Sequence, residues 1–130
     1  MGQRFLIDSN CIIDFTAKII PQTGQNFISQ VIDEKFLISS IVKIEVLGFN
    51  ENIPAKTLEL KEFLELATIL PLDDLVIEKT INLRKAYRKL KLGDAIISAT
   101  ALVHNLTLIT RNTSDFKNIE NLTILNPHEL

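Results

Sequence analysis

The sequence predicts an α/β fold with a mainly parallel sheet of four to five strands. Short apolar runs of three or four residues alternate with longer stretches in which apolar residues recur at helical spacing. Strands that alternate with helices in this way are typical of parallel sheets. The chain has 130 residues, of which 46% are hydrophobic and 23% charged, and this length and composition predict one folded domain that spans residues 1–130.

The expected strands are apolar runs that end at polar or turn-forming residues. They lie at residues 4–7, 36–38, 68–70, 107–110 and 122–125. The expected helices have apolar stripes, and Ser, Asp, Pro or Gly stands at most of their ends, where these residues are favoured. They cover residues 10–20, 23–35, 41–47, 54–67, 74–91 and 95–105. The last of these helices is apolar almost all round, which predicts that it is buried, and Gly93 is expected to separate it from the helix before it.

Composition argues against several classes of protein. One cysteine excludes a disulfide framework and a multi-cysteine zinc site, and two histidines argue against a histidine-rich metal site. The first residues lack the basic cluster and apolar stretch of a signal peptide, and no apolar run reaches the roughly 18 residues of a membrane-spanning helix. We therefore expect a cytoplasmic protein with no membrane association.

Four acidic residues lie where ligands bind in α/β proteins, near the carboxyl ends of the strands. They are Asp8 after the first strand, Glu45 on the helix after the second, Asp94 before the buried helix and Asp115 after the fourth strand. We expect the four to converge at one edge of the sheet. Three of them also have a simple structural interpretation: Asp8 could form an Asx turn, Asp94 could cap a helix, and Asp115 could cap a helix or form a turn.

Glu45 is the most informative of the four. It lies on the apolar face of its predicted helix, one turn after Ile41 and Val42, which predicts that it is buried. An unpaired carboxylate there would cost several kcal/mol, so Glu45 requires a cation. A buried Lys or Arg is one interpretation, and a metal ion is the other.

The grouping of four carboxylates in one cleft has a chemical consequence. They repel one another and cannot all stay ionised without positive charge. Hard divalent cations with oxygen ligands supply that charge, and Mg²⁺ or Mn²⁺ suits such a site better than zinc. A pair of these ions roughly 4 Å apart can activate water on one side of a phosphodiester and stabilise the leaving oxygen on the other. The four acids therefore favour metal-dependent hydrolysis of a phosphodiester.

Four motifs resemble those of the PIN-domain family, and most closely those of the VapC-type toxin ribonucleases of toxin–antitoxin pairs. They are LIDSN at residues 6–10, SIVKIEVLG at 40–48, LGDAIISATA at 92–101 and TRNTSDF at 110–116. The motifs follow the family's order and cover nearly the whole chain. Ser9 is a mild departure, since many relatives have threonine at that point.

The resemblance implies a three-layer α/β/α fold and a Mg²⁺- or Mn²⁺-dependent endonuclease that acts on RNA. It maps the family's catalytic and metal-ligating acids onto Asp8, Glu45, Asp94 and Asp115. It maps the supporting polar residues onto Asn10, Thr110 and Asn112. It also implies a homodimer that a cognate antitoxin holds inactive. Asp8 and Asp94 are the best candidates for direct ligands because packed elements fix their backbone.

Basic residues are concentrated near the acidic ones. Residues 79–119 contain eight basic residues and only two acidic ones, although the whole chain has a net charge of −2. Arg84, Arg88 and Lys91 precede Asp94 and form either a solvated helix face or a patch that follows the phosphates of a nucleic acid. Arg111 is nearer to the expected chemistry and is the better candidate for a phosphate contact.

Other polar residues near these motifs are assigned structural roles. Cys11 is expected in the core as a small hydrophobic residue, and His104 is expected at a helix end as a cap or dipole partner. His128 lies near the carboxyl end and is expected to be exposed. Asp14, one helical turn beyond Asn10, is kept outside the four-acid set, although its position would also allow it to join the site.

Three alternative functions differ in what they require. A receiver-like phosphoryl-transfer protein needs paired acids after its first strand, whereas Ser9 follows Asp8 here. A PIN-fold binding module without activity has no need of four carboxylates. A PIN-fold nuclease that cuts DNA uses the same chemistry, so the sequence leaves the choice between RNA and DNA open.

Overall fold

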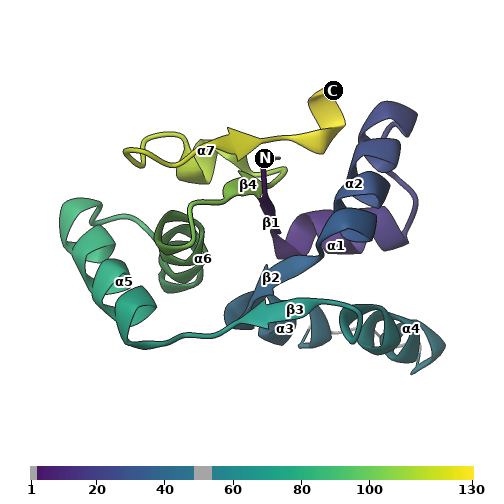
Figure 1. The fold of residues 1–130 in the computed structure, drawn as a ribbon, viewed down its shortest axis with the longest axis horizontal. Coiled ribbons are helices and arrows are strands. Elements are labelled where there is room, and N and C mark those ends of the chain that lie inside the picture. The colour runs from purple at the N-terminus through teal and green to yellow at the C-terminus, as the bar shows by residue number, and fades with distance from the viewer. Residues whose placement is uncertain (1–2, 49–53) are drawn as a thin grey trace.

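The computed structural model of the protein describes residues 3–48 and 54–130. The strands within these ranges are β1 (Phe5–Ile7), β2 (Leu37–Ser39), β3 (Thr68–Leu70), β4 (Thr107–Ile109) and β5 (Ile124–Leu125). All their ladders are parallel: one sheet has the order β1-β4-β5, and β2 pairs with β3 in a second sheet. β2 also packs against β1 (Figure 1). These ladders confirm the predicted α/β class with parallel strands.

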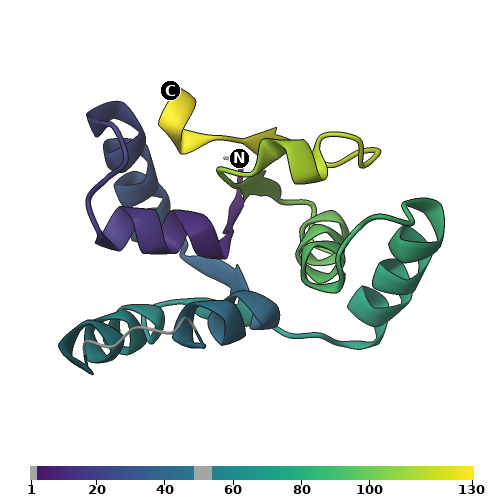
Figure 2. The ribbon, with the colours of Figure 1, turned by 180° about the vertical axis from the view of Figure 1, so that it is seen from behind.

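Helices cover the strands on both sides. They are α1 (Ser9–Thr16), α2 (Gln22–Glu34), α3 (Ser40–Leu47), α4 (Pro54–Leu64), α5 (Asp74–Ala86), α6 (Leu92–Val103), α7 (Thr113–Phe116) and the 3-10 helix η1 (Pro127–Glu129). α1 and α2 lie on one side of β1, and α5 and α6 lie on the other (Figures 1 and 2). None of the helices in the described ranges is long and apolar enough to cross a membrane.

The core lies between the strands and α6. Five residues of β1, β2 and β4 are completely buried, namely Leu6, Ile7, Ile38, Leu108 and Ile109. Strands that are apolar on both faces are typical of parallel sheets covered by helices. Residues 95–101 of α6 are buried as well, which confirms that this apolar helix lies inside the molecule.

The first helix is shorter than predicted. Its apolar pattern continues to Ile20, but α1 ends at Thr16 and Ala17 follows as its cap. Lys18 has a φ of 59°, in the left-handed region, which interrupts the helical path. Ile19 is consequently exposed instead of extending the inner stripe.

The boundary between α5 and α6 also differs from the prediction. α5 ends at Ala86, not at residue 91, and Tyr87 leaves the helical conformation. α6 begins at Leu92, so Gly93 belongs to its first turn and does not separate two helices. Asp94 therefore lies within the first turn of α6 instead of preceding the helix.

Strand register decides which side chains meet at the sheet edge. Ile7 of β1 pairs with Ile109 of β4, and the amide of Asp8 donates a 2.9 Å hydrogen bond to the carbonyl of Ile109. The next residues along the two strands, Asp8 and Thr110, therefore lie side by side. They mark the carboxyl edge of the sheet, where the candidate site begins.

Candidate functional site

Asp8 is a buried carboxylate at the junction of β1 and α1. Its side chain is the cap of α1 and accepts a 2.7 Å hydrogen bond from the Ser9 amide. Thr110 Oγ1 donates at 2.8 Å and Asn10 Nδ2 at 3.1 Å, both to Oδ2. Burial raises the pKa of Asp8, although the hydrogen bonds from Thr110, Ser9 and Asn10 oppose the shift. Asp8 is therefore a helix cap and a fixed member of the site at once.

Glu45 approaches Asp8 from α3. Ser9 Oγ bridges the two acids, since it lies 3.1 Å from Glu45 Oε1 and 3.4 Å from Asp8 Oδ1. The predicted burial of Glu45 is wrong: Val42 and Val46 form the buried stripe of α3, and the Glu45 side chain is exposed. Its pKa is nevertheless raised, because it is partly desolvated and lies near the charge of Asp8, while the Ser9 bond opposes the shift.

No basic residue pairs with Glu45 among the described residues, where the ion pairs involve only Asp14 as the acid. The interpretation that a buried Lys or Arg holds Glu45 is therefore not supported. Glu45 Oε2 instead lies over Gly93, where a Cβ atom would come within 3.3 Å of it. A glycine at this position lets the carboxylate approach the first turn of α6.

Asp94 is the acid that lies close to each of the other three. Its pKa is raised to about 6, chiefly by desolvation and then by the charges of Asp8, Asp115 and Glu45, while Lys91 opposes the shift. Each of the other three carboxylates is thus close enough to disfavour the ionised form of Asp94. The sequence prediction that the four acids converge agrees with this electrostatic coupling.

The acids line two adjoining pockets. The first, of about 450 Å³, is lined by Asp8, Glu45 and Asp94 together with Arg111 and Asn112. The second, of about 370 Å³, is lined by Asp94 and Asp115 together with Arg88 and Lys91. Asp94 is common to both pockets, whereas Asp115, an exposed residue of α7, belongs to the second one.

The oxygen donors around Asp8 and Asp94 fit a metal ion that keeps part of its water shell. Within residues 3–48 and 54–130, no three His, Cys, Asp or Glu side chains are arranged to hold one ion. Mg²⁺ does not require three, because it usually keeps several waters and binds one or two carboxylates directly. Asp8 and Asp94 supply hard oxygen ligands in a pocket with excess negative charge, so the residues present fit Mg²⁺ or Mn²⁺.

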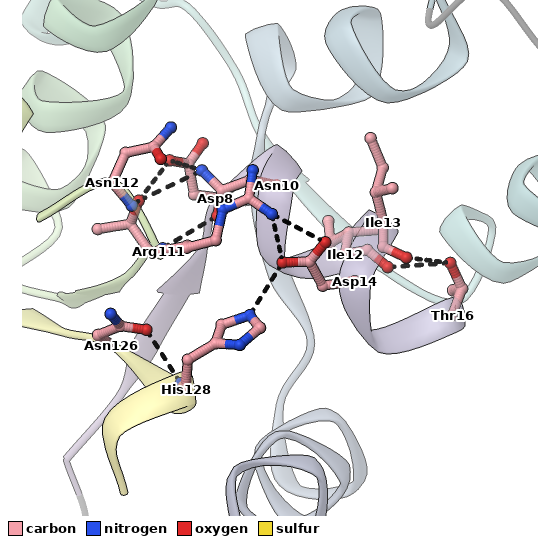
Figure 3. Close-up of polar contacts among 11 residues, drawn as sticks. Asp8, Asn10, Ile12, Ile13, Asp14, Thr16, Arg111, Asn112, Asn126 and His128 are labelled. Atoms are coloured by element: carbon pink, nitrogen blue, oxygen red, sulfur yellow. Dashed lines mark hydrogen bonds and ion pairs between the residues drawn. The ribbon is translucent and has the colours of Figure 1, made fainter. Parts of the chain in front are cut away.

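The supporting polar residues lie around Asp8 (Figure 3). Asn10 Nδ2 lies 3.1 Å from Asp8 Oδ2 and 3.4 Å from Thr110 Oγ1, and Asn10 Oδ1 accepts a 3.0 Å hydrogen bond from the Arg111 amide. The Asn112 amide donates to Thr110 Oγ1 at 3.1 Å. Asn10 and Thr110 thus orient the carboxylate of Asp8, and Asn112 lines the pocket beside them.

The candidate basic residues are not equally close to the acids. Arg88 and Lys91 line the second pocket, in the segment that joins α5 to α6. Arg84 is exposed on α5 and lines neither of the two pockets. Arg111 lines the first pocket, but its Nη1 is engaged by Asp14 at 2.8 and 3.1 Å.

Sequence reasoning missed an ionic cluster formed by Asp14, Arg111 and His128, of which Asp14 and Arg111 line the first pocket. Asp14 is buried, and His128 Nε2 lies 2.9 Å from its Oδ2 (Figure 3). The expectation that His128 is exposed is therefore wrong, because η1 turns its ring toward α1. The only local signal was an acid on the inner side of α1, since its partners are 97 and 114 residues away in sequence.

Two other structural assignments are confirmed. Cys11 is completely buried, and burial together with the charges of Asp8 and Asp14 raises the pKa of its thiol to about 12. A thiol in that state is a poor nucleophile. His104 is the cap at the end of α6.

The fold and pocket define an α/β protein with parallel strands and an acidic pocket at their carboxyl ends. The chain belongs to the PIN-domain family, whose model matches residues 5–122. This match confirms the family that the four sequence motifs indicate. No match is found among the curated proteins.

Solved structures extend the comparison. A toxin–antitoxin complex from Klebsiella pneumoniae contains a chain that is 32% identical, with a TM-score of 0.70 over 96% of this chain and 98% of that chain. FitAcB from Neisseria gonorrhoeae is 27% identical, with a TM-score of 0.77 over 97% and 99% of the two chains. DNA-bound VapBC from Salmonella typhimurium is 22% identical, with a TM-score of 0.81 over 97% and 99%, and shows a shared fold.

Proposed function

We propose that the protein is a Mg²⁺- or Mn²⁺-dependent endoribonuclease and the toxin of a toxin–antitoxin pair, with residues 1–130 acting as one nuclease domain in the cytoplasm. The observation that carries the proposal is the pocket at the carboxyl ends of the parallel strands, which Asp8, Glu45 and Asp94 line together. Membership of the PIN-domain family supports nuclease activity. The similarity to a chain of a toxin–antitoxin complex supports the toxin assignment.

The chain's own residues divide the work of hydrolysis. A bound Mg²⁺ or Mn²⁺ ion would supply the positive charge that makes the attacking water more acidic and stabilises the leaving oxygen. Asp8 and Asp94 would hold the ion, and the donors around Asp8 keep that carboxylate in one orientation. Glu45 is exposed beside Ser9, in a position to orient the attacking water and accept its proton.

The charged residues around the acids would place the RNA strand. Asp115 lines the second pocket and would act there with Asp94, either on a second ion or through water. Arg88 and Lys91 border the same pocket, and Arg111 borders the first. We assign these three residues to backbone phosphates, and Arg84, which is further away, to a more distant phosphate of the same strand.

The proposed activity is tested by incubating the protein with a structured RNA and with single-stranded DNA of the same sequence, in Mn²⁺ and in EDTA. RNA cleavage is expected only in Mn²⁺. Asp94→Asn should reduce it about 100-fold or more, as expected for a charged group at the reacting centre. Asp33→Asn, at an exposed carboxylate of α2, is the matched control and should keep full activity.

The alternatives predict other results in the same assay. Cleavage that survives EDTA would contradict metal dependence. Cleavage of the DNA alone would identify a DNA nuclease. If neither substrate is cut while Mn²⁺ still raises the melting temperature, the chain is a PIN-fold binding module.

We also propose that a cognate antitoxin binds this face and that the toxin forms a homodimer. An antitoxin Arg or Lys would replace metal charge among Asp8, Glu45 and Asp94. Co-expression with a small protein encoded by an adjoining gene should give one complex in size-exclusion chromatography, with two toxin chains by light scattering. Separate elution at micromolar concentration would contradict the pairing.

A further inference from the structure

A buried acid outside the four-carboxylate set ties together three separate parts of the chain. The Asp14 side chain on α1 is only 5% exposed. Arg111 Nη1, from the segment between β4 and α7, contacts both of its oxygens at 2.8 and 3.1 Å. His128 of η1 approaches one of the same oxygens at 2.9 Å (Figure 3). The Asp14 carboxylate therefore restrains one side of the Arg111 guanidinium.

Arg111 faces the pocket with the remainder of its side chain. Its side chain is 48% exposed, and it lines the same pocket as Asp8, Glu45 and Asp94. Its backbone is fixed as well, because its amide donates to Asn10 Oδ1, and Asn10 in turn donates to Asp8. A guanidinium has five N–H donors, so those that Asp14 does not engage remain available to an anion.

The surroundings of Arg111 explain why it needs a restraint. Besides Asp14, three carboxylates line its pocket, namely Asp8, Glu45 and Asp94, and an unrestrained guanidinium would be drawn toward them. Such a pairing would cover the acids and leave no cation at the rim to receive a phosphate. Asp14 competes for the guanidinium, and among the described residues Arg111 pairs with Asp14 and not with Asp8, Glu45 or Asp94.

We propose that Asp14 is a positioning residue that holds Arg111 at the pocket rim, so that the exposed part of its guanidinium binds a phosphate of the RNA strand. The inference rests on the proposed function for its choice of ligand. His128 contacts the same Asp14 oxygen as Arg111 and so connects η1 to the pocket. Removal of the Asp14 charge has two opposite effects on RNA binding. The loss of a negative charge by itself would strengthen binding of a polyanion, whereas the loss of Arg111 positioning would weaken it.

The test is a double-mutant cycle of Asp14→Asn and Arg111→Ala. A fluorescent single-stranded RNA is titrated in EDTA at several KCl concentrations, and its Kd is measured by anisotropy. Each single variant should bind about ten-fold more weakly and lower the slope of log Kd against log salt by about 0.7, the value for one phosphate contact of a single strand. The double variant should bind no more weakly than Arg111→Ala alone, because Asp14 acts through Arg111.

Arg4→Ala is the matched control, because Arg4 is an exposed arginine that precedes β1 at the opposite end of the strand. It should bind within about two-fold of the wild type. If Asp14→Asn does not fold, Arg111→Lys replaces it in the test. Lysine keeps the charge, but it lacks the further N–H groups that arginine offers to a phosphate while its Nη1 is held by Asp14, so it should also bind about ten-fold more weakly.

The outcomes separate this inference from the proposed activity, because binding in EDTA needs no cleavage. An Asp14→Asn protein that binds as tightly as the wild type, or more tightly, overturns the inference. Three further results would overturn it: an Arg111→Lys protein with wild-type affinity, a wild type that binds no RNA, and a double variant in which the two single losses of affinity multiply. A protein that shows the expected cycle but cuts no RNA retains the inference and loses the endonuclease assignment.

Discussion

At the scale of single residues, Asp94 couples protonation to stability. Its pKa is raised to about 6 by partial burial and by Asp8, Asp115 and Glu45, above an ordinary value near 3.8. Between these two values the folded state retains a proton that the unfolded state has lost. The contribution of Asp94 to stability therefore falls as pH rises from about 4 to about 6, and the penalty is complete above that range.

Asp94→Asn should remove this dependence. In EDTA, the melting temperature of the variant relative to that of the wild type should increase between pH 4 and pH 7, because only the wild type acquires the repelled charge. Mn²⁺ should stabilise the wild type above pH 6 and the variant much less. Thermal melts across this pH range provide the measurement, and two parallel curves in EDTA would show that Asp94 is not under repulsion.

Glu45→Gln tests the acid that Ser9 links to Asp8. Because no basic side chain pairs with Glu45 among the described residues, the variant should be as stable as the wild type in EDTA, or more stable. Mn²⁺ at 100 times its Kd should raise the wild-type melting temperature by roughly 5–15 °C, from a linkage of about 2.7 kcal/mol. The variant should show a smaller rise.

The control for this substitution is Glu59→Gln, at an exposed position of α4, which should keep the full Mn²⁺ effect. A Glu45→Gln protein that melts much lower in EDTA and still shows the full rise in Mn²⁺ would exclude Glu45 from the site. That result would instead fit a structural ion pair, whose loss costs about 3–5 kcal/mol when it is buried.

At the scale of elements, the contact between α2 and η1 holds His128 in place. Gly24 of α2 is buried, and a Cβ atom there would overlap the carbonyl oxygen of Pro127 and lie 2.8 Å from Ile20 Cγ2. Gly24→Ala should therefore destabilise the fold by about 1–3 kcal/mol, as overpacking does. Thermal melting checks this against Ser29→Ala, an exposed substitution on the same helix, and equal melting temperatures would contradict the close packing.

The basic segment at the end of α5 is a second element with a measurable role. Replacement of Arg84, Arg88 and Lys91 by Ala should weaken RNA binding and lower the slope of log Kd against log salt by up to about 2. The slope falls because fewer counterions are released when a phosphate contact is lost. All three side chains are exposed, so the melting temperature should barely change. A control that replaces the exposed Lys18, Lys35 and Lys61 should keep the slope, and an unchanged slope in the first variant would assign it to a solvated helix face.

At the scale of the whole molecule, the sequence predicted the features that depend on local apolar pattern and on the order of the strands. Apolar runs located the five strands, and their parallel arrangement brought Asp8 and Thr110 to one edge. The coupling among the four acids follows from the same order. Helix ends were less predictable, because Lys18 and Tyr87 leave the helical conformation while the apolar pattern continues.

The features that sequence reasoning missed depend on distant packing. The exposure of Glu45 is set by which side of α3 packs inward, and an eight-residue helix rich in apolar residues does not specify that side. The cluster of Asp14, Arg111 and His128 joins α1 to a loop and to the end of the chain. Its members carry no shared motif, so only the folded chain reveals it.

The central claim is that the carboxylates at the sheet edge hold a divalent ion. Crystals grown in millimolar Mn²⁺ and measured where manganese scatters anomalously test it most directly. The account predicts an anomalous peak in the pocket lined by Asp8, Glu45 and Asp94, with an oxygen of Asp8 or Asp94 as a direct ligand. A pocket without a peak in ordered crystals, or a peak held only by residues outside the four carboxylates, would contradict it.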